Sequence, residues 1–222
     1  STQDGSDLWF ANSQPYEQVL ASVETAIDPS LDKEEYRIII KDGNRTVTGG
    51  SEAGIRYGVY ALQRNEALGM EGENIEKGSK PRYEYRLLDH WDNLDDTVER
   101  GYAGLSMWEW TSESIPESRI REYGELNRSI GINGAVLNNV NASPHILDTV
   151  RLERVRDIAD ILRGYGMRVY LSVNFATPMA LGELPTADPL NAEVTTWWKE
   201  KAAFIYSMIP DFGGFLVKAS SE

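Results

Sequence analysis

The sequence contains no cysteine, no long apolar run and no cluster of basic residues. Without cysteine there can be no disulfide and no thiolate metal site, although this absence decides nothing about secretion. No apolar run approaches the ~20 residues that a membrane-spanning helix needs, so we expect no membrane contact. The net charge of −13 is spread along the chain, which argues against nucleic acid as a partner.

The sequence also shows no recognisable targeting segment and no pair of residues spaced as metal ligands. No charged and then apolar leader follows Ser1, but a mature or truncated start would look the same, so cytoplasmic and extracellular or periplasmic locations both stay open. The two histidines, His90 and His145, have no spacing typical of a metal site. We therefore expect neither a metal ion nor another cofactor.

Residues 1–80 have the pattern of a small α/β domain. The periodicity predicts a short strand at 8–10, an amphipathic helix over 16–27, strands at 36–40 and 46–48, and a helix over 51–68. Residues 71–80 are polar and contain glycine, which predicts a linker closed by Pro81. We place the domain boundary there.

Beyond Arg82, strands and helices alternate regularly. Strands are predicted at 85–88, 134–137, 168–173 and 213–218, the first of them buried, with helices over 114–130, 146–163 and 192–208 between them. Four such steps are half of a (β/α)8 TIM barrel, whose complete domain has ~250 residues. We therefore interpret the chain as a small N-terminal α/β sandwich domain (1–80) followed by the first half of a barrel (81–222), the N-terminal fragment of a longer enzyme. An independent four-stranded open α/β domain is the alternative.

A barrel carries its functional residues just past the carboxyl ends of its strands. The residues at these positions are amides, a flat indole, one cation and one carboxylic acid, a set that suits an anionic sugar better than a phosphate. They are Trp91, Asp92 and Asn93 after the first strand, Asn138, Asn139 and Val140 after the second, Asn174 after the third, and Lys218 and Glu222 after the fourth.

Two segments carry a specific resemblance. Residues 88–104, Leu-Asp-His-Trp-Asp-Asn-Leu-Asp-Asp-Thr-Val-Glu-Arg-Gly-Tyr-Ala-Gly, and residues 211–222, Asp-Phe-Gly-Gly-Phe-Leu-Val-Lys-Ala-Ser-Ser-Glu, resemble the xylan-debranching α-glucuronidases of glycoside hydrolase family 67. The resemblance implies removal of (4-O-methyl-)glucuronic acid from aldouronic acid oligosaccharides of glucuronoxylan. It covers nearly the whole chain, and the first 80 residues also resemble the domain that precedes the barrel in β-hexosaminidases.

The resemblance also implies roles for individual residues. Glu222 corresponds to the general acid and Lys218 to the residue that contacts the sugar carboxylate, while Trp91 and Val140 correspond to apolar walls around the uronic acid. The chain departs from the family at Ser220, where Asp or Asn is common, which leaves both main roles intact. The resemblance allows a homodimer of the full-length enzyme.

The family inverts the anomeric centre, which requires a second carboxylate about 6.5–9.5 Å from the acid. In the family this base follows later strands, so we expect the 222-residue chain alone to be inactive. A β-hexosaminidase is one alternative, but it would have an Asp-Glu pair where Ser221 precedes Glu222. A non-catalytic carbohydrate-binding module is the other. A packing role is favoured over a xylan cleft for four further tryptophans, Trp108, Trp110, Trp197 and Trp198.

Overall fold

The computed structural model describes residues 15–70, 72, 74–141 and 143–218. These residues divide into two compact units. The first runs to Glu84 and includes Ser129–Gly131, and the second comprises Tyr85–Arg128 and the chain from Ile132 onward. The strand expected at 8–10 lies outside the described residues.

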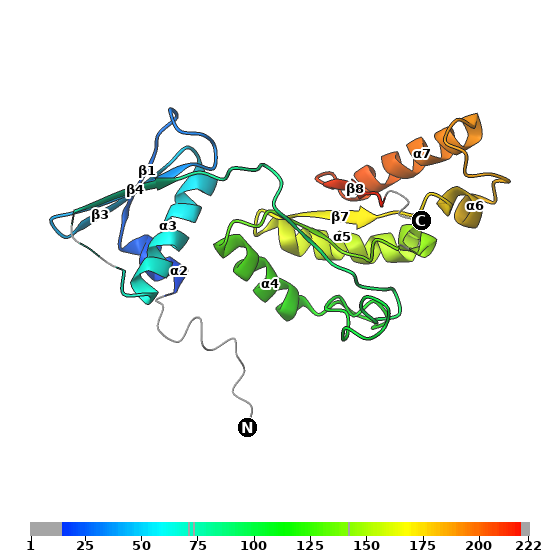
Figure 1. Ribbon diagram of the computed structural model, residues 1–222, viewed down its shortest axis with the longest axis horizontal. Coiled ribbons are helices and arrows are strands. Elements are labelled where there is room, and N and C mark those ends of the chain that lie inside the picture. Colours follow the sequence, from blue (N-terminus) through cyan, green and yellow to red (C-terminus); the bar gives the residue numbers. More distant parts are fainter. Residues whose placement is uncertain (1–14, 71, 73, 142, 219–222) are drawn as a thin grey trace, which may run out of the picture. The chain divides into compact units, whose positions relative to one another are not determined.

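The first unit is a four-stranded sheet covered by two helices (Figure 1). In chain order its elements are α2 (Tyr16–Ala21), β1 (Glu24–Ile27), β2 (Tyr36–Lys41), β3 (Asn44–Gly49), α3 (Glu52–Ala67) and β4 (Ile75–Ser79). The sheet order is β1-β3-β2-β4, in which β1 pairs parallel with β3, and β2 pairs antiparallel with β3 and β4. The predicted hairpin and the helix after Gly50 are confirmed.

The core of the first unit lies between α3 and the sheet. Val59 and Leu62 of α3 pack against Ile38 of β2 and Val47 of β3, and all four side chains are buried. A Cβ atom at Gly58 would lie 2.5 Å from the side chain of Val47, so the missing side chain lets the helix approach β3 closely.

Two predictions in this unit are wrong. The helix expected over 16–27 ends at Ala21, and Glu24–Ile27 instead forms β1 on the free edge of β3. The linker expected over 71–80 contains β4, in which Ile75 pairs with Ile40 of β2. β4 stands at the edge of the sheet and only Ile75 is partly buried, so the strand accepts charged residues and has the composition of a linker.

The second unit is a parallel sheet with helices between its strands (Figure 1). The strands are β5 (Leu87–Asp89), β6 (Gly134–Val136), β7 (Arg168–Ser172) and β8 (Gly214–Leu216), in that order across the sheet. The helices are α4 (Glu117–Ser129), the 3-10 helix η1 (Pro144–Leu147), α5 (Thr149–Arg163), α6 (Thr177–Gly182) and α7 (Ala192–Met208). This α/β arrangement is half of a β/α barrel.

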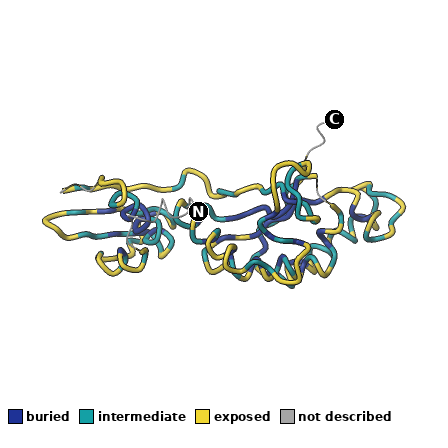
Figure 2. The backbone as a smooth tube through the Cα atoms, turned by 90° about the horizontal axis from the view of Figure 1, so that it is seen from below, coloured by how far each residue is buried: buried dark blue, intermediate teal, exposed yellow. Residues whose placement is uncertain are grey.

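The larger core belongs to this second unit, where buried residues gather on the sheet and on the helix faces that cover it (Figure 2). Trp108 and Trp110 are 0% and 1% exposed, which confirms their packing role. Trp197 and Trp198 are partly buried against the same core. Helix α5 contributes a continuous apolar face of Leu152, Val155, Ile158, Ala159 and Leu162.

The first strand of this sheet differs from its prediction. Tyr85 is 63% exposed and precedes the strand, which begins at Leu87, and Leu88 is 37% exposed. The strand has a neighbour on one side only, because β5 stands at the edge of the sheet order. Helix α6 was not predicted, since six residues are too few to show a helical period. In the described part of the chain, no helix has the length and apolarity to cross a bilayer.

Candidate functional site

The chain that leaves β5 is fixed on one side by His90. The His90 Nε2 atom lies 2.8 Å from the hydroxyl of Tyr123 on α4, and the imidazole packs edge-on against Trp108 at 5.1 Å between ring centres. Burial, with a smaller contribution from the negative charge of Asp92, raises the pKa of the Tyr123 phenol. The phenol is therefore neutral at physiological pH and serves as a fixed hydrogen-bonding partner.

Asp92 fixes the same segment two residues later. Its buried carboxylate accepts hydrogen bonds from Ser106 Oγ at 2.6 Å and from the backbone N–H of Met107 at 3.1 Å. These bonds close the long loop after β5 on itself. Side chains alternate along an extended segment, so the half-buried Trp91 lies on the side opposite to His90 and Asp92.

Asn139, after β6, is the centre of a hydrogen-bond network. Its buried Nδ2 group points at three oxygens of the β5 loop: Asn93 Oδ1 at 3.0 Å, the Glu99 carbonyl at 3.1 Å and the Trp91 carbonyl at 3.3 Å. Its Oδ1 atom accepts from the backbone N–H of Asn141 at 2.9 Å. The loops after β5 and β6 are thus held together by one side chain.

Asn138 makes the equivalent connection to the next strand. Its Nδ2 group donates to the Ser172 carbonyl at 3.1 Å, and its Oδ1 atom accepts from the Ser172 N–H at 2.9 Å. Asn138 is 2% exposed, so these bonds satisfy a buried amide. Beyond β7, the exposed Asn174 accepts from the Ala176 N–H at 2.8 Å, and Val140 is half-buried in the β6 loop.

Lys218, just past β8, connects to the β6 loop. Its exposed Nζ atom donates to Asn141 Oδ1 at 3.0 Å, although the two residues are 77 positions apart. Hydrogen bonds therefore link Lys218, Asn141, Asn139, Asn93 and the backbone of Trp91 in one continuous set. Glu222 lies outside the described residues.

Asp89 is the last residue of β5. Partial burial raises the pKa of its carboxyl, while a hydrogen bond from the Trp91 side chain and the nearby His90 oppose the rise. Hydrogen bonds from Thr97 lower the pKa of Asp95. Among the described residues, no three His, Asp or Glu side chains gather as they would around a metal ion.

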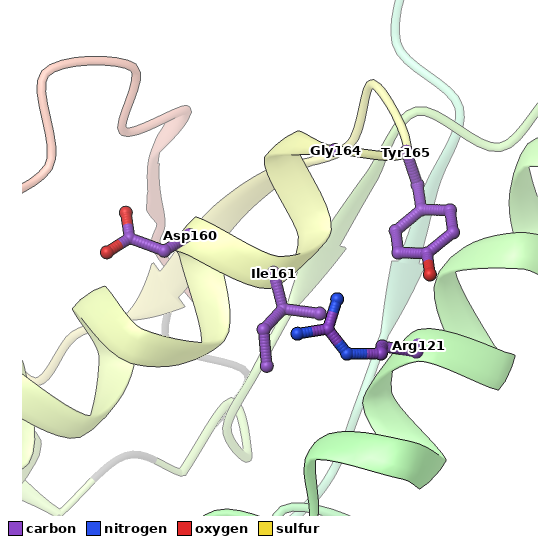
Figure 3. A pocket seen from close by; sticks show the side chains of 5 residues that line it. All are labelled: Arg121, Asp160, Ile161, Gly164 and Tyr165. Carbon is purple, nitrogen blue, oxygen red and sulfur yellow. The ribbon is translucent and has the colours of Figure 1, made fainter.

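A cavity of about 430 Å³ lies elsewhere on this unit, between α4 and α5 (Figure 3). It is lined by Arg121, Asp160, Ile161, Gly164 and Tyr165. Gly164 and Tyr165 form the turn that leads into β7, so the cavity lies toward the amino end of the sheet. Functional residues of a barrel follow the carboxyl ends of its strands, and we therefore take that end as the candidate site.

Two contributors to this end were not among the predicted site residues. Asn141 is the last polar residue of the run after β6, so its position past a strand end was the available signal. Ser106 holds Asp92 from 14 positions away, and nothing in the local pattern around Ser106 indicates this bond.

These features define a β/α-barrel protein with polar side chains past the carboxyl ends of its strands. Solved structures share the fold. A glycoside hydrolase family 138 enzyme targeting pectin rhamnogalacturonan II matches with a TM-score of 0.59 and 15% identity, over 90% of this chain and 28% of that one. A β-N-acetylhexosaminidase from Bacteroides fragilis matches with a TM-score of 0.53 and 15% identity, over 95% of this chain and 49% of that one. At such identities the likeness shows the fold alone.

The family follows from the sequence. Residues 66–222 match the glycosyl hydrolase family 67 middle domain, and the chain belongs to that family.

Curated relatives carry matching names. A probable α-glucuronidase A of Neosartorya fischeri is 37% identical over 219 residues, which is 98% of this chain and 26% of the relative. An α-glucuronidase of Hypocrea jecorina is 39% identical over 208 residues, 88% of this chain and 24% of the relative. The chain thus spans about a quarter of the length of the curated relatives that it matches.

Proposed function

We propose that this chain is part of an α-glucuronidase that releases (4-O-methyl-)glucuronic acid from aldouronic acids derived from glucuronoxylan. The observation that carries the proposal is the 37–39% identity to proteins named α-glucuronidase, which extends over most of the chain. The residues past the carboxyl ends of the parallel strands support the proposal, because an indole, amides and a lysine are suited to an anionic sugar.

In this proposal the sugar lies against the carboxyl ends of β5, β6, β7 and β8. The Lys218 ammonium binds the uronic acid carboxylate, since it projects into solvent just past β8. Trp91 stacks on a C–H face of the sugar, and Val140 forms a second apolar wall. Asn174 offers an amide to a sugar hydroxyl. Three further amides line the wall and are held by bonds to backbone carbonyls, that of Glu99 for Asn93 and Asn139 and that of Ser172 for Asn138.

Glu222, four residues after Lys218, is the proposed general acid. A carboxylic acid protonates the glycosidic oxygen at neutral pH only if its surroundings raise its pKa. The mechanism inverts the anomeric centre, so a second carboxylate activates water on the opposite face of the sugar. We assign that base to the part of the enzyme beyond this chain, and the full-length enzyme is proposed to form a homodimer.

The hexosaminidase alternative has less support. Its likeness to this chain is confined to the fold at 15% identity, whereas the relatives at 37–39% identity are named α-glucuronidases. A non-catalytic sugar-binding module would show no turnover in the full-length protein, which separates it from an enzyme in a single assay.

The test compares the full-length protein encoded by the gene with its Glu222→Gln variant. We expect hydrolysis of aldouronic acid to fall by about 10²–10⁴-fold, because the leaving xylose needs a proton. A glucuronide with an activated leaving group needs little protonation and should retain most of its rate. Equal rates of variant and unmodified enzyme on both substrates would contradict the assignment of Glu222, and absence of turnover by the unmodified enzyme would refute the proposed function.

A further inference from the structure

The position of the Lys218 ammonium depends on a second residue. A lysine side chain has a flexible four-carbon stem, so an exposed ammonium samples many positions unless a partner holds it. Here the Nζ atom of the exposed Lys218 donates to Asn141 Oδ1 at 3.0 Å. The two residues belong to loops after different strands, β8 and β6, so the bond orients the lysine relative to the β6 loop.

Asn141 is itself held by the buried part of the site. Its backbone N–H donates to Asn139 Oδ1 at 2.9 Å, and Asn139 is 4% exposed. The Nδ2 group of Asn139 in turn binds carbonyls of Trp91 and Glu99 in the β5 loop. The amide oxygen that receives the lysine is therefore attached to the same network that fixes the backbone of Trp91.

We infer that Asn141 is a positioning residue that holds the Lys218 ammonium for the carboxylate of the sugar and thereby favours uronic acids over neutral sugars. This inference rests on the proposed function.

The residue type at position 141 fits this role. An ammonium has three N–H donors, and a neutral amide oxygen occupies one of them, so two remain for the incoming carboxylate. The amide also leaves the positive charge uncompensated. A carboxylate at position 141 would form an ion pair with Lys218 and compete with the sugar for the same charge.

The experiment uses the full-length enzyme and two substrates, an aldouronic acid and its carboxyl-reduced counterpart, in which a neutral hexose replaces the uronic acid. The measured quantity is the ratio of kcat/KM for the acid to kcat/KM for the neutral substrate. Asn141→Asp is nearly isosteric and should lower this ratio about tenfold or more, mainly through KM for the acid. Asn141→Leu removes the acceptor without adding charge and should lower the ratio less.

Two further variants make the test specific. Lys218→Met should lower the ratio at least as far as Asn141→Asp. The double variant that combines Lys218→Met with Asn141→Leu should fall no further than Lys218→Met alone, because both changes remove the same interaction. The matched control is Asn44→Asp, which adds the same charge at an exposed position of β3 in the first unit and should leave the ratio unchanged. Thermal unfolding of each variant checks that it is folded.

The failures can be told apart. If Lys218→Met lowers the ratio but Asn141→Asp and Asn141→Leu do not, or if they lower kcat/KM for both substrates equally, the inference is overturned while the proposed function stands. Multiplying effects in the double variant would also overturn it. If Lys218→Met leaves the ratio unchanged, Lys218 does not bind the carboxylate, and the site assignment under the proposed function falls with the inference.

Discussion

The two units of this protein differ in how many buried polar side chains they contain. Among the described residues, Gln63 is the one buried polar residue of the first unit. The second unit contains Asp92, Ser106, Asn127, Asn138, Asn139, Ser172 and Thr177. Burying such groups costs free energy unless each finds a hydrogen-bond partner. The first unit has an almost purely apolar interior, whereas the second buries side chains such as Asp92, Asn138 and Asn139 that bond to neighbouring loops or strands.

Strand direction explains the contrast. In the first sheet β2 runs against its neighbours, so strand ends are divided between two edges. In the second sheet all four strands run in parallel, and the loops that follow them meet at one edge. Asn138 and Asn139 can therefore bind the ends of adjacent strands directly. A site built from several loops needs this convergence, and the second unit alone provides it among the described residues.

The largest expected effect distinguishes a tryptophan of the core from a tryptophan of the candidate site in the second unit. Trp108 is fully buried, so Trp108→Ala should lower the free energy of unfolding of the full-length protein by about 3–5 kcal/mol in urea titrations. Trp91 is only half-buried at the site, so Trp91→Ala should cost less than about half of that while reducing kcat/KM for aldouronic acid. Equal losses of stability in the two variants would show that Trp91 is a core residue.

A smaller effect tests the polar network itself. Asp92→Ala leaves the Ser106 hydroxyl and the Met107 N–H without their buried acceptor, which should cost about 2–3 kcal/mol of unfolding free energy. Glu122→Ala is the control, because that carboxylate is exposed on α4, and it should stay within about 0.5 kcal/mol of the unmodified protein. A similar loss of unfolding free energy in the two variants would contradict a structural role for the Asp92 hydrogen bonds in the loop after β5.

The smallest effect concerns an ion pair outside the site. Hydrogen bonds from Arg163 lower the pKa of the Asp211 carboxyl below its ordinary value. A lowered pKa in the folded state adds stability above the ordinary pKa, and this contribution is lost as the pH falls through the lowered value. Because the pair is partly exposed, Asp211→Asn should cost less than about 1 kcal/mol at pH 7. The difference from the unmodified protein should shrink as chemical unfolding is repeated at progressively lower pH; a difference that grows toward acid would contradict the sign.

The sequence predicted an element correctly where its apolar periodicity and its capping residues agree. The helix over 192–208 was predicted with its observed bounds, because a long periodic segment follows Asn191, whose side chain caps the helix. The pattern failed at residues 24–27, where Val23 and Ile27 also fit a helical spacing. Only the pairing of Glu24–Ile27 with β3 decides between helix and strand there, and that pairing is not visible locally.

The candidate site was predictable in outline for a related reason. Barrel geometry assigns functional residues to strand ends, which selects Trp91, Asn139 and Lys218 from the sequence alone. The partners of these residues could not be predicted in the same way. The bond from Lys218 to Asn141 spans 77 positions, and it depends on the parallel strands bringing two loops together.

The most direct measurement of the central claim is a crystal structure of the full-length Glu222→Gln variant with a bound aldouronic acid. The account predicts the uronic acid at the carboxyl ends of the four strands β5 to β8, with a carboxylate oxygen about 3 Å from the Nζ atom of Lys218. It also predicts the Trp91 indole stacked on the sugar. A sugar bound elsewhere, or one whose carboxylate faces away from Lys218, would contradict the account.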